Sequence, residues 1–116
     1  MRYALAAVLC VVALTIPGQA QGPELPGLYL CEGTSPTGKS YTCAVEITAQ
    51  GDLFGLRWRF ENGEGIGIGI RQGDVLSVIF QLNDGSIGLT SYTITGTTLT
   101  GVWTMPGLPT VATETL

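Results

Sequence analysis

The side chains that most often carry catalysis are sparse in this chain. The sequence contains no histidine, so the Ser-His and Cys-His pairs that activate a nucleophile are excluded. Lys39 is the only lysine and falls in a turn cluster, and no second carboxylate accompanies Asp74 in the sequence. A calcium loop would need acidic residues at alternate positions, and the chain has no such run. We therefore predict no enzyme, no catalytic residue, no metal and no other cofactor.

Glycines at alternate positions form the most conspicuous candidate binding feature, Gly65-x-Gly67-x-Gly69. No helix pattern follows them, so the phosphate-binding loop that such a motif suggests is disfavoured. Spaced by two, they leave one face of a strand as bare backbone. That face serves strong curvature or the approach of an aromatic side chain from the next strand. The functional alternative is the floor of a groove for a ligand or for a partner's strand.

Charged and aromatic side chains supply the other candidates. Arg57 and Arg59 share the polar face of one strand, where they could bind an anion or a partner's carboxylate. The structural alternative is an exposed strand face paired with a cross-strand acid such as Glu46. Trp58 and Trp103 are core residues in one interpretation and ligand-stacking residues in a barrel cavity in the other.

The first twenty residues have the layout of a secretory signal peptide. Met1-Arg2 gives a positive start, Tyr3–Ile16 is apolar and uncharged, and Pro17–Ala20 ends the run with small residues. The apolar run is shorter than the roughly 20 residues that a membrane span needs. We predict cleavage after residue 20, no integral membrane span afterwards, and a secreted or periplasmic protein.

The predicted mature chain is short and acidic. Its 96 residues fit one domain, with two prolines in residues 21–26 predicting a flexible lead-in and residues 27–116 forming the domain. Four basic residues face nine acidic ones, which gives a net charge of −5. No basic patch is available for nucleic acid or anionic lipid. We expect a monomer whose partner is a protein or a small ligand.

Two cysteines remain after the predicted cleavage, Cys31 and Cys43. Without histidine they cannot complete a four-ligand zinc site. A disulfide between them would close a 13-residue segment and contribute about 3 kcal/mol in the chain-entropy model. The alternative is a pair of buried free thiols, and the export signal favours the disulfide.

Strand patterns separated by turn residues account for the rest of the chain. No window has a helical apolar period, and turn signals recur after every short segment. Ile66, Ile68 and Ile70 are expected to face inward, as are Leu76, Val78 and Phe80 on the following strand. Short connections predict an all-β antiparallel meander, either an up-and-down barrel or a curved, partly open sheet, with a two-sheet sandwich as the alternative. The expected strands are residues 27–32, 40–49, 53–60, 65–71, 75–80, 87–95, 98–105 and 111–116.

Four segments carry a resemblance to a known group: Tyr29–Tyr41, Gly67–Val78, Leu99–Thr104 and Thr113–Leu116. They resemble small exported bacterial β-proteins of uncharacterised function, some of which are labelled fibronectin-binding protein. The resemblance implies a small secreted β-domain and carries over no functional residue. A looser similarity to avidin- or lipocalin-type barrels rests on topology and on Gly-x-Trp alone, and is an analogy.

These observations favour a non-catalytic binding module for an extracellular-matrix or envelope protein. The alternative is a carrier that holds a small apolar ligand in a barrel cavity. The candidate ligand or partner surface is Arg57, Arg59, Gly65, Gly67 and Gly69. The candidate cavity lining is Trp58, Trp103, Ile66 and Ile68.

Overall fold

The computed structural model describes residues 24–116, and the predicted signal peptide, residues 1–20, lies outside them. Among the described residues no helix is long and apolar enough to cross a membrane. The strands are β2 (Gly27–Thr34), β3 (Ser40–Gln50), β4 (Leu53–Phe60), β5 (Gly63–Gln72), β6 (Val75–Leu82), β7 (Ile87–Thr95), β8 (Thr98–Thr104) and β9 (Ala112–Thr115).

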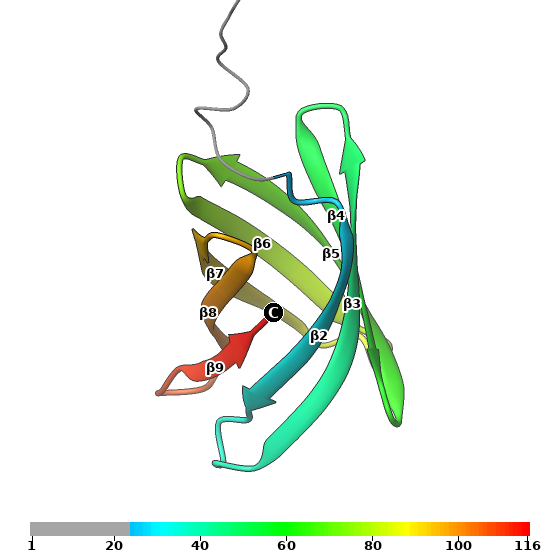
Figure 1. The fold of residues 1–116 in the computed structure, drawn as a ribbon. Helices are drawn as coiled ribbons and strands as arrows, with labels where there is room; N and C mark the ends of the chain where they lie inside the picture. Colours follow the sequence, from blue (N-terminus) through cyan, green and yellow to red (C-terminus); the bar gives the residue numbers. More distant parts are fainter. Residues whose placement is uncertain (1–23) are drawn as a thin grey trace, which may run out of the picture.

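The eight strands form a closed barrel in sequence order (Figure 1). Each strand pairs antiparallel with its neighbour in the chain, and β9 returns to pair with β2 through Glu32 and Thr115. Gly51 and Gly73 open two-residue turns with φ of +63°, a conformation that glycine adopts without the steric cost of a Cβ. The predicted meander and its closure into an up-and-down barrel are confirmed.

The up-and-down path gives the barrel two different ends. We call the closed end the one where the chain enters β2 and where the tight β3–β4, β5–β6 and β7–β8 turns lie. We call the open end the one formed by the β2–β3, β4–β5, β6–β7 and β8–β9 connections. Three of these connections are longer, spanning residues 35–39, 83–86 and 105–111.

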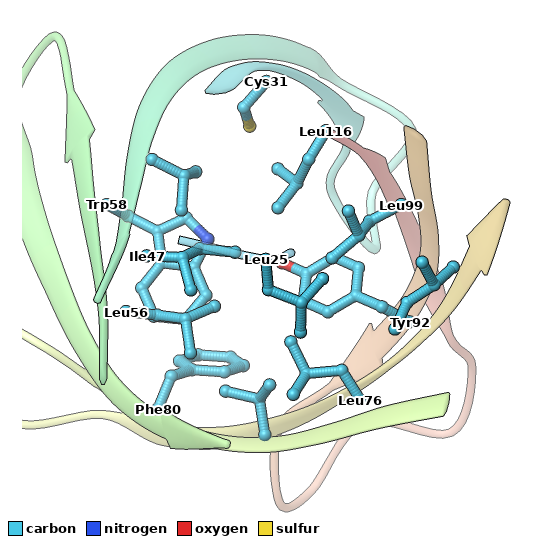
Figure 2. Packing of buried hydrophobic residues seen from close by; sticks show 13 residues of the cluster. Leu25, Cys31, Ile47, Leu56, Trp58, Leu76, Phe80, Tyr92, Leu99 and Leu116 are labelled. Carbon is cyan, nitrogen blue, oxygen red and sulfur yellow. The ribbon is translucent and has the colours of Figure 1, made fainter. Parts of the chain in front are cut away.

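Leu25 fills the interior at the closed end. Its side chain is only 2% exposed, and it lies at the centre of the buried cluster in Figure 2. Its carbonyl accepts a hydrogen bond of 2.6 Å from the hydroxyl of Tyr29. The flexible lead-in predicted for residues 21–26 is therefore wrong at Leu25, because the closed end needs an apolar residue to fill it; residues 21–23 lie outside the described part. The core around it comprises Val45, Ile47, Leu56, Leu76, Ile94, Leu99 and Leu116.

The alternating strand β5 turns its isoleucines outward, contrary to the sequence-based expectation. Ile66, Ile68 and Ile70 are 53%, 50% and 59% exposed, whereas the glycines between them face the interior. The reason is the space that Trp58 occupies. A Cβ at Gly67 would lie 2.9 Å from Cζ3 of Trp58 and 2.7 Å from the carbonyl oxygen of Ile79. Side chains on that face would overfill the interior, so the branched residues point outside.

The disulfide predicted from the sequence is confirmed. Cys31 and Cys43 are directly opposite each other in the β2–β3 register, and their sulfurs are bonded. The link ties the first hairpin together next to the β2–β9 seam, where pairing is shortest. The cross-link therefore reinforces the strand that closes the barrel.

Candidate functional site

A pocket of about 800 Å³ opens at the open end of the barrel. Side chains from β3, β4, β6 and β8 form its walls, and the connections at the open end form its mouth. Its volume falls in the range of small-molecule sites. The aromatic residues that line it are Tyr41, Trp58, Phe60, Phe80 and Trp103.

The five aromatic rings form a continuous series around the pocket. Tyr41 contacts both Phe60 and Trp103, with ring centroids 5.9 and 6.4 Å apart. Phe80 contacts both Trp103 and Trp58, at 6.0 and 5.9 Å. Three of the contacts are edge-to-face and one is tilted, arrangements that aromatic pairs favour. Each ring therefore holds the next in place before any ligand enters.

Glycines on neighbouring strands lie beneath three of these rings, those of Tyr41, Trp58 and Phe80. Phe80 is directly opposite Gly88 in the β6–β7 register, and a Cβ at Gly88 would collide with the Phe80 ring and with the Thr104 carbonyl. An aromatic side chain that lies over a glycine covers bare backbone and packs flat against the wall. The lumen beside it stays open. The same relation recurs in Tyr41 over Gly33, Trp58 over Gly67 and Tyr92 over Gly101.

A buried carboxylate, that of Glu114 on β9, lies at the inner end of the pocket. Its side chain is 5% exposed and accepts three hydrogen bonds. Oε1 accepts from the Tyr41 hydroxyl at 2.7 Å. Oε2 accepts from Trp58 Nε1 at 3.0 Å and from the Tyr92 hydroxyl at 2.5 Å. Figure 2 shows the Trp58 nitrogen and the Tyr92 oxygen pointing toward the middle of the barrel.

No basic side chain in residues 24–116 pairs with this carboxylate. The ion pair of the described region joins Arg57 and Glu64 at 3.5 Å on the outer surface. Glu114 is therefore held by hydrogen-bond donors alone. Burying a carboxylate without an opposite charge is costly, and donors aimed at it offset only part of that cost.

The two tyrosines act as fixed donors to Glu114. Burial, followed by the negative charge of Glu114 and the hydrogen bond to it, raises the pKa of Tyr92 well above its ordinary value of 10.0. The same causes raise the pKa of Tyr41. Both hydroxyls therefore keep their protons at any physiological pH and present them to the carboxylate.

One buried hydroxyl in the pocket has no partner. Thr90 on β7 is 4% exposed and lines the pocket, and within the described region its hydroxyl makes no hydrogen bond. Buried polar groups in proteins are nearly always paired. An unpaired hydroxyl on a residue that lines a pocket is consistent with a polar group of a bound molecule as its partner.

The mouth of the pocket is acidic. Glu61, Glu64 and Asp84 line it, while Lys39 is the only basic residue among the described residues of the lining. Hydrogen bonds from the backbone and side chain of Ser86 lower the pKa of Asp84. With Glu114, the pocket presents four carboxyl groups and one ammonium group.

The disulfide adjoins this site without forming a metal centre. The sulfurs of Cys31 and Cys43 lie with a Glu114 carboxylate oxygen inside a 4.8 Å cluster. Both sulfurs are bonded to each other and are not available as thiolate ligands. The bridge therefore acts here as packing against the carboxylate.

The structure separates the residues predicted from the sequence into three groups. Trp58 and Trp103 line the pocket, as predicted, whereas Ile66 and Ile68 are on the outer surface and were wrongly placed in the cavity. Gly65, Gly67 and Gly69 were predicted on a ligand or partner surface; they face the interior beneath Trp58 and its neighbours, so they are not on an outer partner surface. Arg57 and Arg59 are exposed on the outside of β4 and do not line the pocket, although Arg57 pairs with Glu64 at its mouth.

Glu114 is the principal site residue that sequence reasoning missed. Ala112, Glu114 and Leu116 occupy alternate positions and are all buried. An acidic residue within an otherwise apolar alternating face was therefore the available signal. Its partners could not be read from the sequence, because they lie 73, 56 and 22 residues away.

Comparison of the chain with protein-family models, with curated proteins and with solved structures found no match.

Proposed function

We propose that this chain is a small-molecule-binding protein that takes its ligand into the open end of the barrel. The observation that carries the proposal is the pocket, which combines aromatic walls with a buried carboxylate. Mostly apolar walls with a few fixed polar groups are typical of small-molecule sites. Eight strands also make a barrel wide enough to hold one small ligand.

The rigidity of the site supports the same proposal. The five rings contact one another, three of them rest on glycines, and Glu114 accepts three hydrogen bonds. A site that is ordered before binding loses less side-chain entropy when the ligand arrives. Binding then needs no large rearrangement of the barrel.

We propose that the protein acts in the bacterial periplasm or outside the cell. The predicted signal peptide supports export, and the Cys31–Cys43 disulfide suits an oxidising compartment. We propose that its role there is to bind and carry a small ligand.

Intrinsic fluorescence tests the proposal directly. Trp58 and Trp103 are the only tryptophans in the chain, and both line the pocket. A ligand that enters should change the emission in a saturable way, without a dye. We expect such hits in a screen of small metabolites, and we expect Trp103→Phe to retain the change reported by Trp58. A screen with no saturable response from the folded protein would overturn the proposal.

A second candidate is a partner-binding surface on the outside of the barrel. Ile68, Ile79 and Leu89 are adjacent in the β5–β6–β7 register, and all three are at least half exposed. An exposed apolar row of this kind is a common feature of protein-binding surfaces. Direct binding to matrix and envelope proteins, compared with an Ile79→Thr variant, tests it; equal binding by both proteins would exclude this row.

A further inference from the structure

We propose that the ligand of the open-end pocket is an organic cation, a quaternary or protonated amine whose positive charge sits among the aromatic rings and faces Glu114. The inference rests on the proposed function and names the chemistry of its ligand. Three independent features of the pocket carry it: an uncompensated carboxylate, a series of ring faces and edges, and an acidic mouth.

The first feature is the charge that the protein leaves without a counter-charge. Glu114 lines the pocket and receives one hydrogen bond on Oε1 and two on Oε2. A carboxylate oxygen can accept two hydrogen bonds, so Oε1 retains capacity for the N–H of a protonated amine, whereas a quaternary ammonium group would interact with it through charge alone. None of the described basic side chains supplies a positive charge there. A cationic ligand would provide the counter-charge in a poorly solvated site, where the attraction is strongest.

The second feature is the composition of the walls. Trp58, Trp103 and Tyr41 are the ring types that attract cations best through their negative faces. They belong to the contacting series that surrounds the pocket. A quaternary ammonium group depends on contacts with aromatic rings, because it has no N–H with which to donate a hydrogen bond to a carbonyl or hydroxyl oxygen. A compact group of aromatic rings is the recurring protein solution for this ligand class.

The third feature is the mouth. Glu61, Glu64 and Asp84 line the entrance together with Lys39. Arg57 pairs with Glu64 from the outer surface, and the three carboxylates still outnumber the two cations. A cleft lined mainly by one sign of charge concentrates ligands of the opposite sign. Anionic ligands would meet these carboxylates first and Glu114 afterwards. The mouth and the inner end of the pocket therefore select for the same charge.

Thr90 indicates that the ligand also carries a polar group. Its buried hydroxyl lines the pocket and can donate or accept one hydrogen bond. A ligand that carries a hydroxyl or carbonyl group near its ammonium group would satisfy it. Amino alcohols with an alkylated nitrogen have both groups at short separation.

A matched pair of probes tests the inference on the unchanged protein. Choline carries a quaternary ammonium group and a hydroxyl; its uncharged isostere, dimethylbutanol, has a quaternary carbon in place of the nitrogen. Their shapes are nearly the same, so a difference in affinity reports the charge. We expect choline to bind at least about tenfold more tightly, a difference that corresponds to about 1.4 kcal/mol. Nitrogen–proton NMR of the two indole groups measures both affinities.

The outcomes separate the inference from the proposed function. Equal or tighter binding of the uncharged isostere overturns the cation inference and leaves a small-molecule pocket in place. Failure of both probes, with neutral hits in the fluorescence screen, overturns the inference alone. Failure of both probes and of the screen overturns the proposed function as well.

A conservative variant locates the effect at the buried carboxylate. Glu114→Gln keeps an acceptor for Trp58 and Tyr92 and lets the amide donate to the Tyr41 hydroxyl, while it removes the charge. We expect the preference for choline over its isostere to fall to within about twofold. Glu46→Gln removes the same charge from the exposed outer face of β3 and should leave the preference unchanged. An unchanged preference in Glu114→Gln that remains folded would refute the assigned role of Glu114.

Discussion

The two halves of this barrel solve the same packing problem in opposite ways. The closed half is filled by branched aliphatic side chains, with Leu25 supplied by the segment before β2. The open half has aromatic rings flattened against glycines, and the space beside them remains empty. Aliphatic side chains interdigitate to fill a lumen, whereas rings on bare backbone line one. Under the proposed function, stability therefore resides mainly in the closed half and ligand binding in the open half of one barrel.

Glu114 lies where the two halves meet. Among the changes considered, its removal should lower the free energy of unfolding the most. Glu114→Ala would leave three buried donors, on Tyr41, Trp58 and Tyr92, without an acceptor. Each orphaned donor costs about 1–3 kcal/mol, so we expect a loss of about 4 kcal/mol in the free energy of unfolding, measured by urea denaturation. Glu46→Ala on the outer face should change it by less than about 0.5 kcal/mol. A loss in Glu114→Ala below about 1 kcal/mol would contradict the account.

A pair of truncations separates the halves directly. Leu76 at the closed half is fully buried, so Leu76→Ala should cost about 3 kcal/mol through the cavity that it creates. The folded Leu76→Ala protein should bind its ligand with the same affinity as the unchanged protein. Phe60 lines the pocket and is only partly buried, so Phe60→Ala should cost about 1 kcal/mol and weaken binding severalfold. The comparison would fail if Leu76→Ala weakened ligand binding while Phe60→Ala left it unchanged.

Adding one methyl group inside the open half should also be costly. Gly67→Ala would place a Cβ against the Trp58 ring and the Ile79 carbonyl oxygen, and the backbone oxygen cannot move away independently. We expect a loss of about 2 kcal/mol and displacement of Trp58, visible as a change in its fluorescence. Ile68→Ala on the outer face of the same strand should cost less than about 1 kcal/mol. If Gly67→Ala proved neutral, the close packing of Trp58 on β5 would be wrong.

The smallest effect concerns alkaline pH. Burial, and then the charge of Glu114, raises the pKa of Tyr92 in the folded state above 10.0. The unfolded chain therefore releases this proton first, and the contribution of Tyr92 is complete below pH 10 and falls above it. One tyrosine contributes a slope of about −1.4 kcal/mol per pH unit. Unfolding by urea from pH 9 to 11 should show the decline, and Tyr92→Phe should make it shallower. An identical slope in both proteins would show that Tyr92 is not coupled to folding.

The sequence predicts the barrel because short, alternating segments with tight turns leave few ways to pair. It also predicts the disulfide, because Cys31 and Cys43 fall opposite each other once a hairpin is assumed. The orientation of β5 was not predictable in the same way. Alternation of Gly67 with Ile66 and Ile68 shows which residues share a face, and hydrophobicity alone favours the isoleucines inside. The available volume, set by Trp58 on the neighbouring strand, decides otherwise.

The site was less accessible to sequence reasoning than the fold. Trp58 and Trp103 could be proposed from their residue type, since amphipathic rings suit both cores and pockets. Glu114 could not, because its role exists only after closure brings β9 beside the far side of the barrel. Three donors from β3, β4 and β7 converge on it, and none is a neighbour of β9 in the strand order.

Titration with choline, followed through the indole N–H resonances, tests the central claim most directly. Trp58 donates its N–H to Glu114, whereas Trp103 donates its N–H to the carbonyl oxygen of Thr113 near the mouth. The account predicts saturable shifts of both resonances with one dissociation constant, and at least about tenfold weaker binding of the uncharged isostere. Unmoved indole resonances, or equal affinities for the two probes, would contradict a cation site at the open end.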